Sequence, residues 1–77
     1  MNSITDYLLI KHGYKLIEGD NRKFAVWLKD NVSITMHMHD IHHLRCWHVL
    51  KDNKRVYKDL CFTEAYRKSE TLHGRVF

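Results

Sequence analysis

The segment from residue 37 to residue 43 holds the densest set of side chains that could do chemistry: four histidines and one aspartate. On a strand, His37 and His39 would project from one face about 6.5 Å apart, a workable span for two ligands of one ion. The aspartate and histidines that follow could complete a zinc shell, since zinc accepts imidazole and carboxylate together. Ligands that cluster only in sequence rarely make a site. We therefore expect a polar strand face and a histidine-rich loop, with adventitious metal binding as the alternative and no functional metal or cofactor.

Two cysteines raise the possibility of a nucleophilic thiol. Cys46 could use His48, which would share its strand face, and Cys61 could use His73. Such a site also needs an orienting group and an oxyanion pocket. No glycine-rich turn lies near Cys46 in the sequence to build one. Small, semi-buried structural cysteines are commoner than catalytic ones, so we expect no catalytic residue and no enzyme activity.

Basic residues interleave with aromatic residues between Arg45 and Lys68. A positive hairpin beside a basic helix could lie along a phosphate backbone, with an aromatic ring stacking on a base. The alternative is a solvated hairpin whose lysines keep its edge from pairing, because no nucleic-acid-binding signature accompanies the charge. The polar strand face of His37 and His39 is a second candidate surface. The residues predicted to bind a partner or nucleic acid are Arg45, Trp47, Lys51, Lys54, Arg55, Tyr57 and Lys58.

Two short helices are expected near the ends of the chain. Ser3 can cap the first, an apolar stripe at helical spacing follows, and Gly13 suits the left-handed position just past its end. Thr63 can cap the second, which ends before Gly74. The residues of this second helix that can face a sheet are Ala65, Tyr66, Ser69 and Leu72 or His73.

Three Asp-Asn pairs, at residues 20–21, 30–31 and 52–53, predict two-residue hairpin turns, because both residue types tolerate positive φ. Strands that alternate apolar and polar residues flank these turns. The sequence therefore predicts an α+β fold, a small antiparallel β-meander of about five strands with an N-terminal and a C-terminal helix, both on one face. We expect a single domain over residues 1–77.

Pairing across the turns predicts which side chains share a sheet face. The pairs expected from the first two turns are Tyr14 with Trp27, Leu16 with Ala25, and Trp27 with Ile34. The core face would then hold Tyr14, Leu16, Ala25, Trp27, Val32, Ile34, Met36 and Met38. The pairs expected from the third turn are Val49 with Val56 and Trp47 with Lys58. The alternation of this last hairpin is less regular, so either both its faces are buried or its register is shifted by one residue.

The composition is that of an ordinary globular domain, with 44% hydrophobic and 29% charged residues. A chain of 77 residues leaves little room for a deep substrate pocket. Its net charge of +4 mildly favours a polyanionic partner. The first residues lack the pattern of a signal peptide, and the apolar run at 7–10 is too short to cross a bilayer. We expect a cytoplasmic protein with free thiols and no membrane partner.

Two segments resemble known families. Residues 4–39, with a helix, a Gly-Tyr pair and three strands, are similar to HicA-type toxin endoribonucleases, which implies their α-β-β-β-α fold. The stretch that matches their catalytic histidine motif, residues 20–23, has no histidine here, so their activity is not implied. The segment from Trp47 to Lys68 resembles the arm-binding domains of phage integrases in its aromatic strand, Lys-Arg turn and Thr-Glu-Ala helix start. That resemblance implies a sheet that enters the DNA major groove.

In its small size and single-domain economy the chain also resembles phage accessory proteins, including anti-CRISPR and other anti-defence inhibitors. We expect a non-catalytic binding protein of this phage or mobile-element type, which blocks or modulates a host protein or nucleoprotein complex by occupying a site on it. The alternative is a module that binds DNA or RNA directly through the basic hairpin. A small toxin-like RNase is the third possibility.

Overall fold

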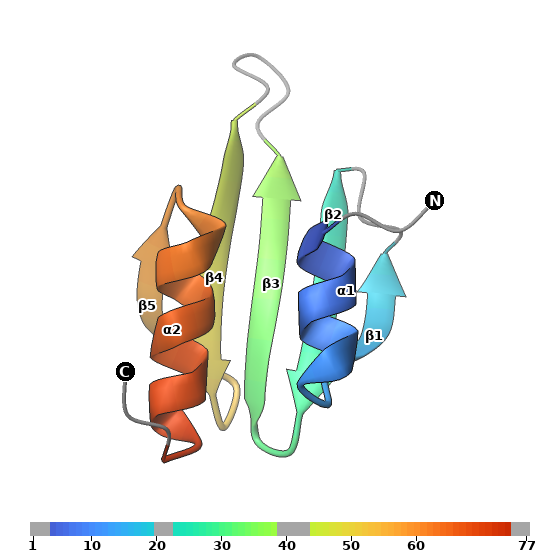
Figure 1. Ribbon diagram of the computed structural model, residues 1–77. Coiled ribbons are helices and arrows are strands. Elements are labelled where there is room, and N and C mark those ends of the chain that lie inside the picture. The colour runs from blue at the N-terminus through green and yellow to red at the C-terminus, as the bar shows by residue number, and fades with distance from the viewer. Residues whose placement is uncertain (1–3, 20–22, 39–43, 75–77) are drawn as a thin grey trace.

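A computed structural model describes residues 4–19, 23–38 and 44–74 of the chain. Five strands form one antiparallel sheet in the order β1-β2-β3-β4-β5, with one helix before them and one after (Figure 1). The elements are α1 (Ile4–Lys11), β1 (Lys15–Gly19), β2 (Phe24–Lys29), β3 (Val32–Met38), β4 (Arg45–Lys51), β5 (Lys54–Asp59) and α2 (Phe62–Leu72). The predicted α+β meander with two terminal helices is confirmed.

Both helices pack on the same face of the sheet, α1 in front of β2 and α2 in front of β4 and β5 (Figure 1). The core lies between this face and the helices. In β2 and β3 alternate residues are buried, as expected for strands with one covered face. The buried core residues are Leu9, Tyr14, Ala25, Trp27, Val32, Ile34, Met36, Trp47, Val49, Ala65 and Tyr66. No helix in the described part of the chain is long and apolar enough to cross a membrane.

Two of the predicted Asp-Asn turns are confirmed. Asp30 has a φ of 54°, and Asp52 and Asn53 have φ values of 52° and 66°, which favours these residue types at tight hairpin turns. Gly13 ends α1 in the left-handed conformation, with a φ of 93°. The turn predicted at residues 20–21 and the cap predicted at residue 3 lie outside the described residues.

The pairing of β2 with β3 is confirmed, since Trp27 lies opposite Ile34. The predicted pairing of β1 with β2 is wrong: Leu16, not Tyr14, lies opposite Trp27, and Gly19 takes the place predicted for Leu16 opposite Ala25. Two features of the backbone cause the difference. The connection to β2 is longer than a two-residue turn, and a β-bulge at Ile17 shifts the register.

Burial along the predicted core face follows from this register. Six of its eight members are buried, whereas Leu16 is 41% exposed and Met38 is half-buried. Leu16 lies on β1, the outermost strand, which has a neighbouring strand on one side only. Gly19 shows how tightly β1 approaches β2, because a Cβ at this position would lie 2.1 Å from the carbonyl oxygen of Phe24.

The pairing of β4 with β5 is shifted by one residue from the predicted register, which was one of the two explanations for the irregular alternation. A bulge at Val56 places Tyr57, not Val56, opposite Val49, and Asp59, not Lys58, opposite Trp47. Val56 is 46% exposed, whereas Val49 is fully buried. The predicted pairs Val49–Val56 and Trp47–Lys58 are therefore wrong, and the shifted register accounts for the irregular alternation.

Helix α2 begins earlier than predicted. Its N-cap is Cys61 and its first residue is Phe62, so Thr63 lies inside the first turn and is not the cap. The early start lets the Phe62 ring pack on Trp47, with ring centroids 4.9 Å apart. No side chain makes a capping hydrogen bond at Cys61, and Asp59 Oδ1 accepts the backbone N–H of Cys61 at 2.8 Å just before the helix. Of the residues predicted to face the sheet, Ala65, Tyr66 and Ser69 are buried, and Glu70 is buried with them.

Candidate binding surface

The side chains predicted to bind a partner are divided between the two faces of the sheet. Residues that pair across a sheet share a face, so the register assigns each one. Arg45, Trp47, Lys51, Lys54 and Tyr57 lie on the side that carries the helices, and Arg55 and Lys58 lie on the other side. Alternation along each strand causes most of this division, and the bulge at Val56 exchanges the faces of Tyr57 and Lys58, because it moves both by one position relative to β4.

The two predicted aromatic contacts differ in their availability. Trp47 is only 4% exposed and packs against Phe62, so its ring is not available to stack on a base. Tyr57 is half-buried, and its hydroxyl donates a hydrogen bond to Asp59 Oδ2 at 2.7 Å. This hydrogen bond raises the pKa of Tyr57 and lowers the pKa of Asp59. Arg45, Lys51 and Lys54 are exposed on the helix-bearing side.

We call the side of the sheet turned away from α1 and α2 the open face, because no helix of the described residues covers it (Figure 1). Three rows of paired side chains cross it. The first row is Lys15, Leu28, Ser33, Leu50 and Arg55. The second row is Glu18, Val26, Thr35, His48 and Lys58. The third row is Phe24, His37 and Cys46.

The open face has two chemically different halves. The apolar half consists of Phe24, Val26 and Leu28, three half-buried side chains of β2. The other half carries His37, His48, Arg55 and Lys58, from β3, β4 and β5, beside the buried Cys46 and the half-buried Leu50 of β4, and we call it the basic half. Phe24 joins the two halves, since its ring makes an edge contact with His37 at a centroid distance of 5.4 Å. This is an amphipathic surface, with apolar area on one side and hydrogen-bond donors on the other.

Charges within the basic half act on one another. Burial, followed by the positive charges of Arg55 and Lys58, lowers the pKa of His48 below its ordinary value. His37 contributes to the same effect. The rows of this face contain one carboxylate, Glu18, which lies in the same row as His48 but three strands away, roughly 14 Å at the usual strand spacing. The basic half is therefore a region of positive potential.

The cysteines do not form a nucleophilic site with the histidines considered above. Cys46 and His48 share the open face as predicted, but Cys46 is only 3% exposed. Cys61 and His73 cap opposite ends of α2, about 18 Å apart by the rise of a helix. Most of the histidine cluster, residues 39–43, lies outside the described residues. Within the part that the structure describes, no three His, Cys, Asp or Glu side chains are grouped so as to hold a metal ion.

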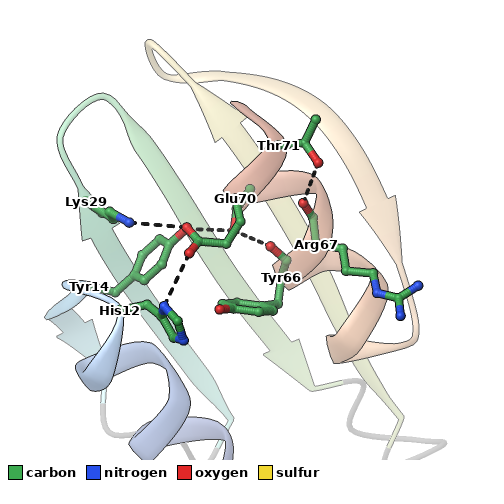
Figure 2. Close-up of polar contacts among 8 residues, drawn as sticks. His12, Tyr14, Lys29, Tyr66, Arg67, Glu70 and Thr71 are labelled. Carbon is green, nitrogen blue, oxygen red and sulfur yellow. Dashed lines mark hydrogen bonds and ion pairs between the residues drawn. The ribbon is translucent and has the colours of Figure 1, made fainter. Parts of the chain in front are cut away.

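A buried polar cluster on the helix-bearing side was not predicted (Figure 2). Glu70 of α2 is fully buried, and its Oε2 accepts hydrogen bonds from the Tyr14 hydroxyl at 3.0 Å and the Lys29 ammonium at 3.2 Å. Its Oε1 lies 3.5 Å from Nδ1 of His12. The Tyr14 hydroxyl is also 2.7 Å from Oγ of Ser69. The cluster thus connects α2 to the segment after α1 and to the end of β2.

A signal for this cluster exists in the sequence. Tyr66, Ser69, Glu70 and His73 follow the i, i+3, i+4, i+7 spacing of one helix face, so a carboxylate on that face has to be buried with a partner. The partners come from residues 12, 14 and 29, which only the tertiary fold brings together. Because Glu70 has no exposed surface and its contacts join three elements, its role in this structure is to hold the fold together.

Known protein families, curated proteins and solved structures were each compared with the chain, and none of them matches it.

Proposed function

We propose that this chain is a non-catalytic binding protein that docks through its open face on a nucleoprotein complex and blocks or modulates it by occupying that site. The observation that supports this function best is the uncovered sheet face, with its apolar half on β2 beside its basic half on β3, β4 and β5. Protein interfaces combine an apolar centre with a polar, hydrogen-bonding surround. The positive charge selects a partner surface that carries negative charge.

The same surface favours a nucleoprotein over bare nucleic acid as the partner. Single-stranded nucleic acids are bound by exposed aromatic rings that stack on bases. On the open face the aromatic side chain is Phe24, which already packs against His37, and Trp47 is buried on the other side. The aliphatic side chains Val26 and Leu28 instead offer area for an apolar protein contact. Direct binding of DNA or RNA through Arg55 and Lys58 is the second candidate function.

The surroundings of the side chains that could do chemistry support a non-catalytic role. Cys46 is buried, and the carboxylate of Glu70 is fully buried among its hydrogen-bond partners. A cytoplasmic location belongs to the same proposal, because Cys46 and Cys61 are both free thiols and free thiols persist in reducing compartments.

A matched pair of charge reversals tests the proposed surface. The double variant Arg55→Glu with Lys58→Glu changes the open face, and Lys51→Glu with Lys54→Glu makes the same change of charge on the helix-bearing side of the same hairpin. Each tagged protein is used for a pull-down from bacterial lysate, with and without nuclease. We expect the open-face variant to lose the complexes that wild type and the control variant retain. Melting temperatures should stay close to wild type in both, since exposed charges contribute little to stability.

The outcomes separate the candidate functions. Equal retention by both variants, or loss only in the helix-side variant, would show that the open face is not the working surface. The second function holds if nuclease removes all captured material and purified nucleic acid binds the protein with a steep salt dependence. For each neutralised phosphate, the logarithm of the affinity should then fall by close to one unit per tenfold rise in salt. A partner that stays bound after nuclease, with a shallower salt dependence, supports the first.

A further inference from the structure

One pocket on the open face brings together donor side chains from three strands. It has a volume of about 210 Å³ and is lined by His37 and Met38 of β3, Cys46 and His48 of β4, and Lys58 of β5. Pockets for drug-sized ligands begin at roughly 300 Å³, while one water occupies about 30 Å³ of the liquid. The pocket therefore has room for one small chemical group with a few waters, and not for a whole metabolite.

The lining of this pocket suits an anion. The ammonium of Lys58 has only donors, and each imidazole offers one N–H when neutral and two when protonated. The nearest carboxylate in the rows of the open face, Glu18, is three strands from His48. Among the described residues, an anion at this point would meet several donors and little competition from a resident negative charge.

We propose that this pocket binds one phosphate group, supplied by the nucleic-acid backbone of the partner complex, with the Lys58 ammonium and the ring N–H groups of His37 and His48 as donors. The source of the phosphate rests on the proposed function. The site itself belongs to the free protein and can be measured without any partner. A phosphate group fits because it presents several acceptor oxygens to donors that converge from different strands.

The titration of His48 is consistent with an anion site. The charged and titratable groups facing His48 are His37 on β3, Cys46 beside it on β4, and Arg55 and Lys58 on β5. Burial, then the charges of Arg55, Lys58 and His37, lowers the pKa of His48. A bound phosphate offsets those positive charges, so the pKa of His48 rises on binding. By linkage, phosphate affinity should then increase as the pH falls through that pKa.

An NMR titration of the histidine rings with inorganic phosphate tests the site, at about pH 6, where imidazole charge changes, and at ionic strength held constant with chloride. We expect the ring signals of His37 and His48 to shift in a saturable manner. His12 and His73 are internal controls, because both lie on the helix-bearing side. Shifts of His12 and His73 as large as those of His37 and His48, or shifts that do not saturate, would overturn the proposal.

Two variants of the same hairpin sharpen this test. Lys58→Gln removes one charge from the pocket and should weaken phosphate binding about fivefold, the effect of one unit charge at about 4 Å in a water-like medium. Lys54→Gln removes one charge from the other face and should leave the affinity unchanged. Equal affinities in the two variants would contradict the assignment of Lys58. Unchanged His12 and His73 signals confirm that each variant is folded.

A second titration identifies the source of the phosphate. Dimethyl phosphate represents the diester of a nucleic-acid backbone, and phenyl phosphate represents a monoester. Saturable shifts of His37 and His48 with dimethyl phosphate support a backbone phosphate, whereas binding of the monoester alone refutes that source. Failure of this inference is distinguishable from failure of the proposed function, because the pull-down with open-face variants does not depend on the pocket being occupied by phosphate.

Discussion

The hydroxyl group of Tyr14 links the segment after α1 to helix α2, and Tyr14→Phe removes this link while leaving the ring in place. The hydroxyl donates to the buried carboxylate of Glu70 at 3.0 Å and lies 2.7 Å from Ser69 Oγ. The ring keeps its core packing and its contact with the Lys29 ammonium, 5.3 Å from the ring centroid. A hydrogen bond to a charged group contributes about 1.5–3 kcal/mol, so we expect the variant to lose that much of its free energy of unfolding.

This loss is large for a chain of 77 residues, whose total stability should be about 4–12 kcal/mol. For a domain of this size it corresponds to a fall in the melting temperature of about 6–24 °C. Thermal and urea unfolding followed by circular dichroism would measure it. Tyr57→Phe is the matched control, because that hydroxyl also donates to a carboxylate, Asp59 Oδ2 at 2.7 Å, but on the exposed hairpin. We expect a clearly smaller change in the control.

The free energy of unfolding at alkaline pH gives an independent test of the Tyr14 hydrogen bond; we call this part of the pH dependence the alkaline limb. Burial, with a further contribution from Glu70, raises the pKa of Tyr14 above its ordinary value. The unfolded state therefore ionises at this tyrosine before the folded state does, so the stability that Tyr14 contributes is present below about pH 10 and is lost as the pH rises further. Tyr14→Phe should remove this part of the pH dependence. A variant as stable as wild type, with an unchanged alkaline limb, would refute the described hydrogen bonding.

Further perturbations test the burial of Trp27, the close approach of β1 to β2, the charges around His48 and the prediction that no metal stabilises the fold. Trp27→Ala should cost about 3–5 kcal/mol in chemical unfolding, as for other buried aromatic side chains, and a cost below 1 kcal/mol would contradict its burial. Gly19→Ala should lower the melting temperature, because its φ is 79° and a Cβ would meet the Phe24 carbonyl oxygen at 2.1 Å; an unchanged midpoint would show that β1 pairs differently. In an NMR pH titration, Lys58→Gln should raise the pKa of His48, since Lys58 is one of the charges that lower it, and no change would mean that the two side chains are apart. Excess chelator should leave the melting temperature of wild type unchanged, and a fall of many degrees would reveal a structural metal.

The fold class, the central strands and two turns were predictable because the signals that determine them are local. The alternation in β3 and the Asp-Asn turn at residues 30–31 fix which residues face the core and how β2 pairs with β3. The helix end at Gly13 follows from its freedom to adopt positive φ. These signals are read within a few residues of one another, and tertiary contacts did not override them.

The errors share a different physical origin. Each bulge adds one residue to a strand, at Ile17 and at Val56, and an inserted residue leaves no trace in a pattern that only alternates. The bulge at Val56 exchanges the faces expected for Tyr57 and Lys58, so the sequence could not show that Lys58 joins Arg55 on the open face. The polar cluster of Glu70 was missed because its partners are 41 and 56 residues away in the sequence.

The two bulges also affect how copies of this chain meet one another. An open sheet exposes unpaired N–H and C=O groups along both outer strands, here β1 and β5, and a flat outer strand can recruit a strand from a second molecule. In this sheet both outer strands carry a bulge, at Ile17 and at Val56. A bulge twists its strand and breaks the regular spacing of hydrogen-bonding groups. Growth of the sheet by edge-to-edge addition is therefore disfavoured at both ends, even though apolar side chains such as Leu16 and Ile17 are exposed there.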